Sequence, residues 1–223
     1  MNDSHRDEGH SHVGGHEVDE SPFALSPHAA RVIAAAKLLV EAGVLTRDEI
    51  DHQLTVAGQR NPADGAWLVA RAWVDADFRA LLRSDFKSAV RQLGLDASGK
   101  VEFAVVENGP RVHHIVVCTL CSCYPRAILG SPPDWYKSTA YRSRAIREPR
   151  VVLSEFGVEL ADDVHIEVHD STADLRYLVL PSRPEATEHL TENELAQLVS
   201  RDALIGVAVP RYRPERPAGD GEL

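Results

Sequence analysis

The spacing of apolar residues changes near residue 100. Between residues 28 and 95 they recur at the spacing of helices, each stretch bounded by residues that start or stop a helix. Thr46 and Glu49 form a capping box, and Asn61 before Pro62 is a cap followed by a first-turn proline. These helices carry too little apolar surface for a compact domain, so we expect an arm that lies against the rest of the chain or a partner.

Beyond residue 100 the pattern alternates, as in half-buried strands, and further helices lie between and after these strands. Strands are expected at 101–105, 112–118, 164–168 and 175–180, and helices at 149–156 and 191–199. The mixed order predicts an α+β fold, with a helical N-terminal arm over 26–98 followed by a mixed, sandwich-like domain over 99–210. The polar ends, residues 1–25 and 211–223, are expected to be loose tails.

Composition narrows the class of protein. The chain has 34 acidic and 24 basic residues, a net charge of -10 that disfavours a nucleic-acid binder. Its apolar runs are too short to cross a membrane, and its N-terminus lacks a secretory pattern. Three cysteines within six positions are no disulfide framework, and they indicate a reducing cytoplasm. The N-terminal tail carries His5, His10, His12 and His16, which suit loose metal binding or simple solvation.

The cysteines follow the expected strand 112–118 with the spacing Cys-x-x-Cys-x-Cys. The thiolates of Cys118, Cys121 and Cys123 are close enough in sequence to converge on one metal ion. With a single residue between the last two, the amide nitrogens of Ser122 and Cys123 can complete an equatorial plane. Sulfur and amidate donors suit Co(III) or Fe(III), and they do not suit Mg²⁺ or Ca²⁺.

Three other interpretations compete with this metal site. A structural zinc ion needs a fourth ligand, but a strand places His113 and His114 on opposite faces. A redox Cys-x-x-Cys pair normally opens a helix, and Tyr124-Pro125 does not fit one. The cysteines can also be buried and inert. The spacing favours the metal site over all three.

Residues 117–125, Val-Cys-Thr-Leu-Cys-Ser-Cys-Tyr-Pro, resemble the metal-binding claw of the nitrile hydratase α subunit; the claw itself is residues 118–123. The same superfamily includes the γ subunit of thiocyanate hydrolase. The resemblance covers roughly residues 30–210 and includes Gly130, Pro133-x-Trp135-Tyr136-Lys137-Ser138, Tyr141-Arg142-x-Arg144, Glu148-Pro149-Arg150, Ser154-Glu155-Phe156-Gly157, residues 175–181 and residues 201–208.

The resemblance implies a set of roles for the claw. Cys118, Cys121 and Cys123 are the sulfur ligands, with Cys121 as sulfinic acid and Cys123 as sulfenic acid. Ser122 and Cys123 supply amide nitrogens, and Arg176 lies near the site. Thr119 resembles the cobalt branch, which implies one Co(III) per chain in preference to Fe(III). The implied reaction is hydration of a nitrile to the amide, with the metal as Lewis acid and the Cys123 oxygen or an activated water as nucleophile.

The resemblance also implies partners, and two departures leave the substrate open. A β subunit, or a β part split into two chains, supplies arginines to the oxidised sulfurs, and an activator or metallochaperone inserts the metal. Most nitrile hydratases have Trp where this chain has Arg126, which is closer to the thiocyanate hydrolase γ subunit. A family glutamine is missing near Gly99. The expected substrate is therefore a nitrile, such as the heteroaromatic toyocamycin, or thiocyanate, converted to carbonyl sulfide and ammonia.

Two candidates of other classes remain. The histidine-rich tail suits a metal-carrying or cobalt-donor protein, and a zinc-stabilised binding module is the simplest alternative.

Other polar and aromatic residues have weaker signals. His165 and His169 share a face of an expected strand, and we expect them to be solvated. Aromatic residues after the claw either line a pocket mouth or pack the turn, and a run of arginines forms a solvated face or contacts an acidic partner. These residues are Trp135, Tyr136 and Tyr141, and Arg142, Arg144, Arg147 and Arg150.

Overall fold

The computed structural model describes residues 27–121 and 123–214, which fall into two compact units divided between His52 and Gln53. The described part of the first unit holds helix α1 (Pro27–Glu41) and the start of helix α2 (Arg47–Gln59). No residue of α1 is buried, and Val32, Ile33 and Leu38 are 54%, 54% and 64% exposed. Among the described residues, this helix therefore contributes to no buried core.

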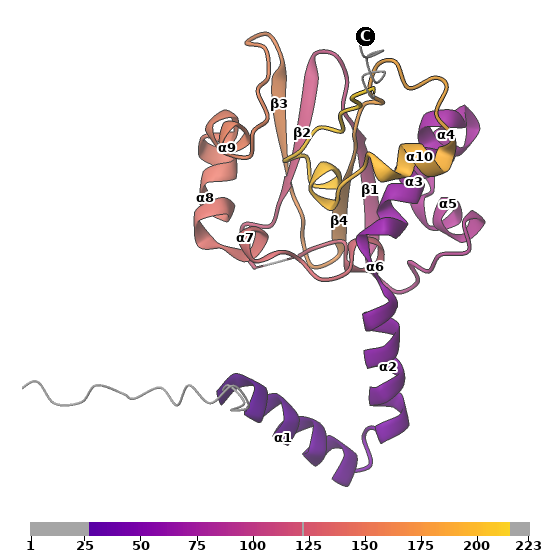
Figure 1. Cartoon of the computed structure of the whole chain (residues 1–223). Coiled ribbons are helices and arrows are strands. Elements are labelled where there is room, and N and C mark those ends of the chain that lie inside the picture. Colours follow the sequence, from indigo (N-terminus) through magenta and orange to yellow (C-terminus); the bar gives the residue numbers. More distant parts are fainter. Residues whose placement is uncertain (1–26, 122, 215–223) are drawn as a thin grey trace, which may run out of the picture. The chain divides into compact units, whose positions relative to one another are not determined.

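The second unit is built on two pairs of parallel strands (Figure 1). The strands are β1 (Glu102–Glu107), β2 (Val112–Val117), β3 (His165–Asp170) and β4 (Leu175–Leu180). β1 pairs with β4, and β2 pairs with β3 in a register that runs from Val112 opposite His165 to Val117 opposite Asp170. Strands β2 and β3 consequently end at the same edge of their sheet.

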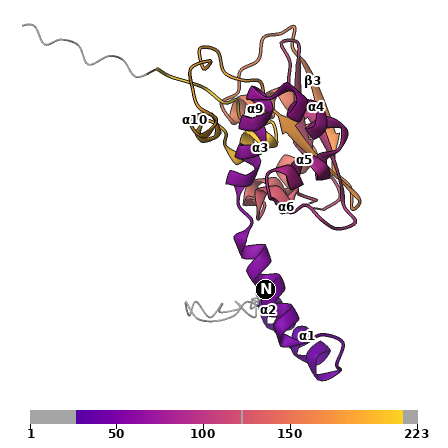
Figure 2. The same ribbon diagram turned by 90° about the vertical axis from the view of Figure 1, so that its right-hand side faces the viewer.

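Helices pack on both sides of these strands (Figures 1 and 2). In chain order they are α3 (Pro62–Val74), α4 (Ala76–Ser84), α5 (Phe86–Gln92), α6 (Arg126–Leu129), α7 (Asp134–Lys137), α8 (Thr139–Arg147), α9 (Pro149–Glu155), α10 (Glu192–Gln197) and the 3₁₀ helix η1 (Arg201–Leu204). Helices α4 and α5 contact β1, α8 contacts β2, α9 contacts β3, and α3 lies against α10. The α+β class predicted from the sequence is confirmed.

The helix starts predicted from capping residues are confirmed. Thr46 and Glu49 hydrogen-bond each other reciprocally at the start of α2. The Asn61 side chain accepts a hydrogen bond of 2.7 Å from the backbone N–H of Ala63. Thr191 opens α10 with a full capping box. No described helix is both long and apolar enough to span a membrane.

The core joins helices that precede residue 99 to strands that follow it. The domain boundary predicted there stays a prediction. Leu68 and Val69 of α3 and Phe86 of α5 lie in one cluster of buried residues with Leu178 and Val179 of β4. Helices α3 and α5 thus find the surface they need within the chain, because their apolar faces cover the strands. Sequence spacing shows that such a face exists but not what it packs against.

A close backbone contact joins the C-terminal segment to β2. The carbonyl of Ile205 accepts a hydrogen bond of 2.9 Å from the backbone N–H of Val116, and the carbonyl of Gly206 lies 2.7 Å from Nε2 of buried His113. Gly206 has φ +88°, and a Cβ there would lie 1.9 Å from the carbonyl oxygen of His114. Only glycine fits this position.

We predict that Gly206→Ala lowers the free energy of unfolding by roughly 3 kcal/mol or more, because strain and overpacking add. Gly157→Ala is the matched control, since Gly157 also has positive φ (+79°) but open space around its Cβ position. It should cost only about 1 kcal/mol. Thermal unfolding of the two variants measures the difference, and equal losses would contradict the contact with β2.

Candidate metal centre

The three cysteines converge at the carboxyl end of β2. The Sγ atom of Cys118 lies 3.5 Å from that of Cys121, which lies 3.3 Å from that of Cys123. All three sulfur atoms lie within 4.8 Å of one another. Cys118 is buried, Cys123 is half-buried and Cys121 is exposed. The sulfurs therefore form a compact triad that opens to the surface.

The donor set fits a thiophilic metal ion. Burial and hydrogen bonds from Cys121 and Cys118 raise the pKa of Cys123 to about 12, while the charge of Arg176 acts in the opposite direction. Three thiolates at this spacing repel one another unless a cation lies between them. Sulfur ligands select transition metals over Mg²⁺ and Ca²⁺. Ser122 lies outside the described residues, so its role as an amide ligand stays a prediction.

A carboxylate on the neighbouring strand holds the claw. Asp170, the last residue of β3, accepts hydrogen bonds from the backbone N–H of Thr119 (2.9 Å) and from its hydroxyl (2.5 Å). The guanidinium of Arg142 donates to the Thr119 carbonyl at 3.4 Å. Sequence reasoning missed Asp170. The sequence shows only that Asp170 is a carboxylate at the end of an expected strand. Its position beside the claw follows from the pairing of β3 with β2.

Buried aromatic side chains support the claw. The hydroxyl of Tyr136 donates to the carbonyl of Cys123 at 2.9 Å, and that of Tyr141 donates to the carbonyl of Val116 at 2.7 Å. Burial raises the pKa of both phenols well above the usual range, so they remain donors. The ring of Trp135 packs edge-on against both tyrosines. Of the two roles open from the sequence, these residues pack the turn.

Arg176 lies in β4, which pairs with β1 and not with the strand that leads to the claw. It is the second residue of β4, which begins shortly after β3 ends at Asp170. Its guanidinium donates to the backbone carbonyls of Thr172 and Leu175, and its charge lowers the pKa of Cys123. The structure thus brings Arg176 and Cys123 together, while a role in chemistry stays a prediction.

The claw lies on the surface of the unit. The side chain of Leu120, between the first two cysteines, is 88% exposed. Beside it is an open hollow of about 380 Å³, lined by Thr119, Thr139, Arg142, Ser143, Ile146 and Arg147. A small molecule or a side chain from another protein therefore has access to the sulfurs.

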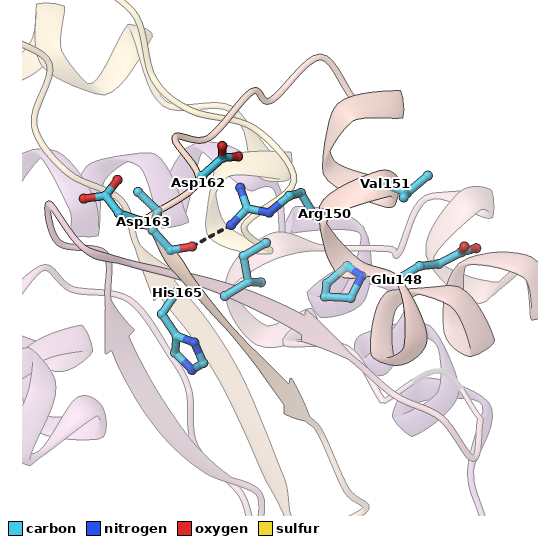
Figure 3. Close-up of a pocket in the computed structure, with 9 residues that line it drawn as sticks. Glu148, Arg150, Val151, Asp162, Asp163 and His165 are labelled. Carbon is cyan, nitrogen blue, oxygen red and sulfur yellow. Dashed lines mark hydrogen bonds between the residues drawn. The ribbon is translucent and has the colours of Figure 1, made fainter.

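The arginines after the claw do not form the solvated basic face that the sequence suggested. Arg144 pairs with Glu148 and Glu155. Arg150 donates to the carbonyls of Leu160, Ala161 and Val164, the last at 2.7 Å, and so ties α9 to the loop before β3. Figure 3 shows Arg150 with Asp162 and Asp163 of that loop. A hollow of about 420 Å³ surrounds Arg150 at the amino end of β3, the end opposite the claw.

The strand histidines differ from one another. His165 is exposed, as the sequence led us to expect. His169 is not solvated as expected, because its Nε2 atom lies 2.8 Å from Nδ1 of buried His114. The parallel register of β2 and β3 brings the two rings together, and no spacing within β3 alone could show it.

The chain is similar in sequence to proteins of one known family. The family described as "Nitrile hydratase, alpha chain" matches residues 26–208. The low-molecular-weight cobalt-containing nitrile hydratase subunit α of Rhodococcus rhodochrous is 52% identical over 183 residues, which are 82% of this chain and 88% of that protein. The thiocyanate hydrolase subunit γ of Thiobacillus thioparus is 42% identical over 192 residues, covering 80% of this chain and 78% of the relative.

A solved structure shows the same fold. An Fe-type nitrile hydratase from Comamonas testosteroni Ni1 superposes with a TM-score of 0.77 at 39% identity, covering 86% of this chain and 97% of that one. The family match extends over the arm, the claw and the strands alike. The chain belongs to the nitrile hydratase α-chain family.

Proposed function

We propose that this chain is the α subunit of a cobalt nitrile hydratase, which adds water to a nitrile to form the amide. The observation that carries the proposal is the convergence of three sulfur atoms within 4.8 Å at the end of β2. Cys118, Cys121 and Cys123 with the amide of Ser122 hold the metal. Cobalt-containing relatives support cobalt over iron, although an Fe-type enzyme has the same fold.

The residues of the claw have separate tasks. Trivalent cobalt, when bound, supplies a Lewis acid for the nitrile nitrogen. Cys121 carries two oxygen atoms as sulfinic acid and Cys123 carries one as sulfenic acid. The oxygen on Cys123 adds to the nitrile carbon or directs the water that does. Arg176 stabilises negative charge on the oxygen of Cys123, consistent with its effect on the pKa of that thiol.

The second half of the site comes from a partner. The claw is exposed at Leu120, and none of the 15 residues of α1 is buried in the part of the chain that the structure describes. A helix of this length is marginal in water unless its apolar side chains are packed. A β-type subunit, whole or split, is the partner that the named relatives suggest, since they too are subunits. Its side chains reach the oxidised sulfurs.

Thiocyanate hydrolysis is the second candidate function. Arg126 is exposed in α6, three residues after Cys123, and adds a positive charge beside the claw. A cation there favours an anionic substrate. The thiocyanate hydrolase γ subunit is among the similar proteins.

We predict that Cys121→Ala abolishes cobalt retention, because the claw then keeps only two of its three sulfurs. The chain is produced with cobalt and its partner subunits, and metal is counted by elemental analysis. Leu120→Ala is the matched control, since this exposed residue lies in the same loop but offers no ligand. It should retain about one cobalt per chain and hydrate a nitrile. Cobalt content unchanged in the Cys121 variant would contradict the claw.

We predict that Thr119→Val weakens cobalt retention and lowers stability by about 1 kcal/mol, because Asp170 loses the hydroxyl it accepts from. Thr119→Ser keeps the hydroxyl and should behave as the wild type. A double-mutant cycle with Asp170→Ala isolates the pair, and additive losses would show that the two side chains do not interact.

We predict amide formation from aliphatic or heteroaromatic nitriles by the cobalt-loaded complex, and no carbonyl sulfide from thiocyanate. If thiocyanate is the substrate instead, Arg126→Gln should lower kcat/KM for it roughly five- to tenfold, the effect of one nearby charge in a solvated site. Arg91→Gln, which removes a charge from an exposed arginine of α5, is the control. Assay of both products with one preparation decides between the two functions.

A further inference from the structure

A second group of metal-ligating side chains lies on the body of the β2–β3 pair. The Nδ1 atom of His114 is 2.8 Å from Nε2 of His169 and 3.6 Å from Oε2 of Glu167. The same carboxylate oxygen is 3.9 Å from Nε2 of His169. This group shares no residue with the claw.

The parallel register assembles it. His114 of β2 lies opposite Glu167 of β3, and Val116 lies opposite His169. Residues two apart on a strand share a face, so all three donors project from the same side of the pair. The other side carries Ile115 and Val168, which pack in the small apolar cluster with α9.

The His114 ring turns one nitrogen toward both of the other donors. Its Nδ1 atom is the one that lies near His169 Nε2 and Glu167 Oε2. Burial lowers the pKa of His114 and of His169, which favours the neutral imidazole, the form that binds metals.

The spacing suits a small divalent ion. Ligand atoms about 2.0–2.1 Å from a tetrahedral zinc ion are roughly 3.4 Å from one another. The three distances of 2.8, 3.6 and 3.9 Å bracket that value, so shifts of a few tenths of an ångström suffice. The Glu167 side chain is 47% exposed, which gives the ion a path of entry and leaves a position for water.

We propose that His114, Glu167 and His169 form a second metal site, which takes a divalent transition-metal ion of the zinc type. It is separate from the claw, because His114 precedes Cys118 by four residues, about 13 Å of extended chain. The ion links β2 to β3 next to the residues that hold the claw in place. His114 lies on the strand that leads to Cys118, and His169 adjoins Asp170, which holds Thr119.

The test measures zinc binding by the full-length, cobalt-loaded complex in equilibrium dialysis against Zn²⁺. His169→Gln should bind one zinc ion fewer per chain than the wild type, or bind that ion at least about tenfold more weakly. His165→Gln is the matched control, an exposed histidine of the same strand that should lose nothing. Zinc held by the histidines of the N-terminal tail is common to all these proteins and cancels in the comparison.

A second variant distinguishes loss of the metal site from misfolding of the protein. Glu167→Gln changes an exposed side chain and should also weaken the site, with the cobalt content of the claw and the circular dichroism spectrum unchanged. Zinc should raise the melting temperature of the wild type and of His165→Gln, and raise it less in the other two variants. Equal zinc binding and equal stabilisation in all four proteins would overturn the proposal and leave a hydrogen bond between two histidines.

Discussion

The parallel pairing of β2 with β3 is the constraint on which the site depends. It ends both strands at one edge, so that Asp170 lies beside the residue from which the claw departs. The carboxylate then holds both the backbone N–H and the hydroxyl of Thr119. A register shifted by one residue would turn the side chain of Asp170 to the other face and release the loop. The position of the sulfur ligands is thus set by backbone pairing in the sheet.

The claw is exposed, so packing of its own side chains does not fix its conformation. Buried residues beneath the claw do so. Leu120 and Cys121 are exposed at the surface. Tyr136 and Tyr141 lie underneath and donate hydrogen bonds to the carbonyls of Cys123 and Val116. Fully buried phenols exchange these partners only at a high cost. The oxidisable cysteines of the claw are therefore supported by buried, unreactive tyrosines.

Features that depend on neighbouring residues were predictable from the sequence, and features that depend on strand register were not. The capping box of Thr46 and the cluster of cysteines are local, because a few residues determine each of them. Asp170 and the His114–His169 contact join segments more than fifty residues apart in the sequence. The same limit applies to the helices before residue 99, since the sequence of α3 shows an apolar face without showing what covers it.

The chemistry of the donors explains how one pair of strands can present two different metal sites. Thiolates at the strand end select a soft, thiophilic ion, while neutral imidazoles and a carboxylate accept most first-row divalent ions in the order of their general affinity. The first set lies in a loop that can wrap around an ion, whereas His114 and His169 project from paired strands whose spacing is fixed near 4.8 Å. A fixed spacing favours an ion of one size and opposes a change of coordination number. A structural ion on the strands and a reactive ion in the loop are therefore compatible assignments for the same sheet.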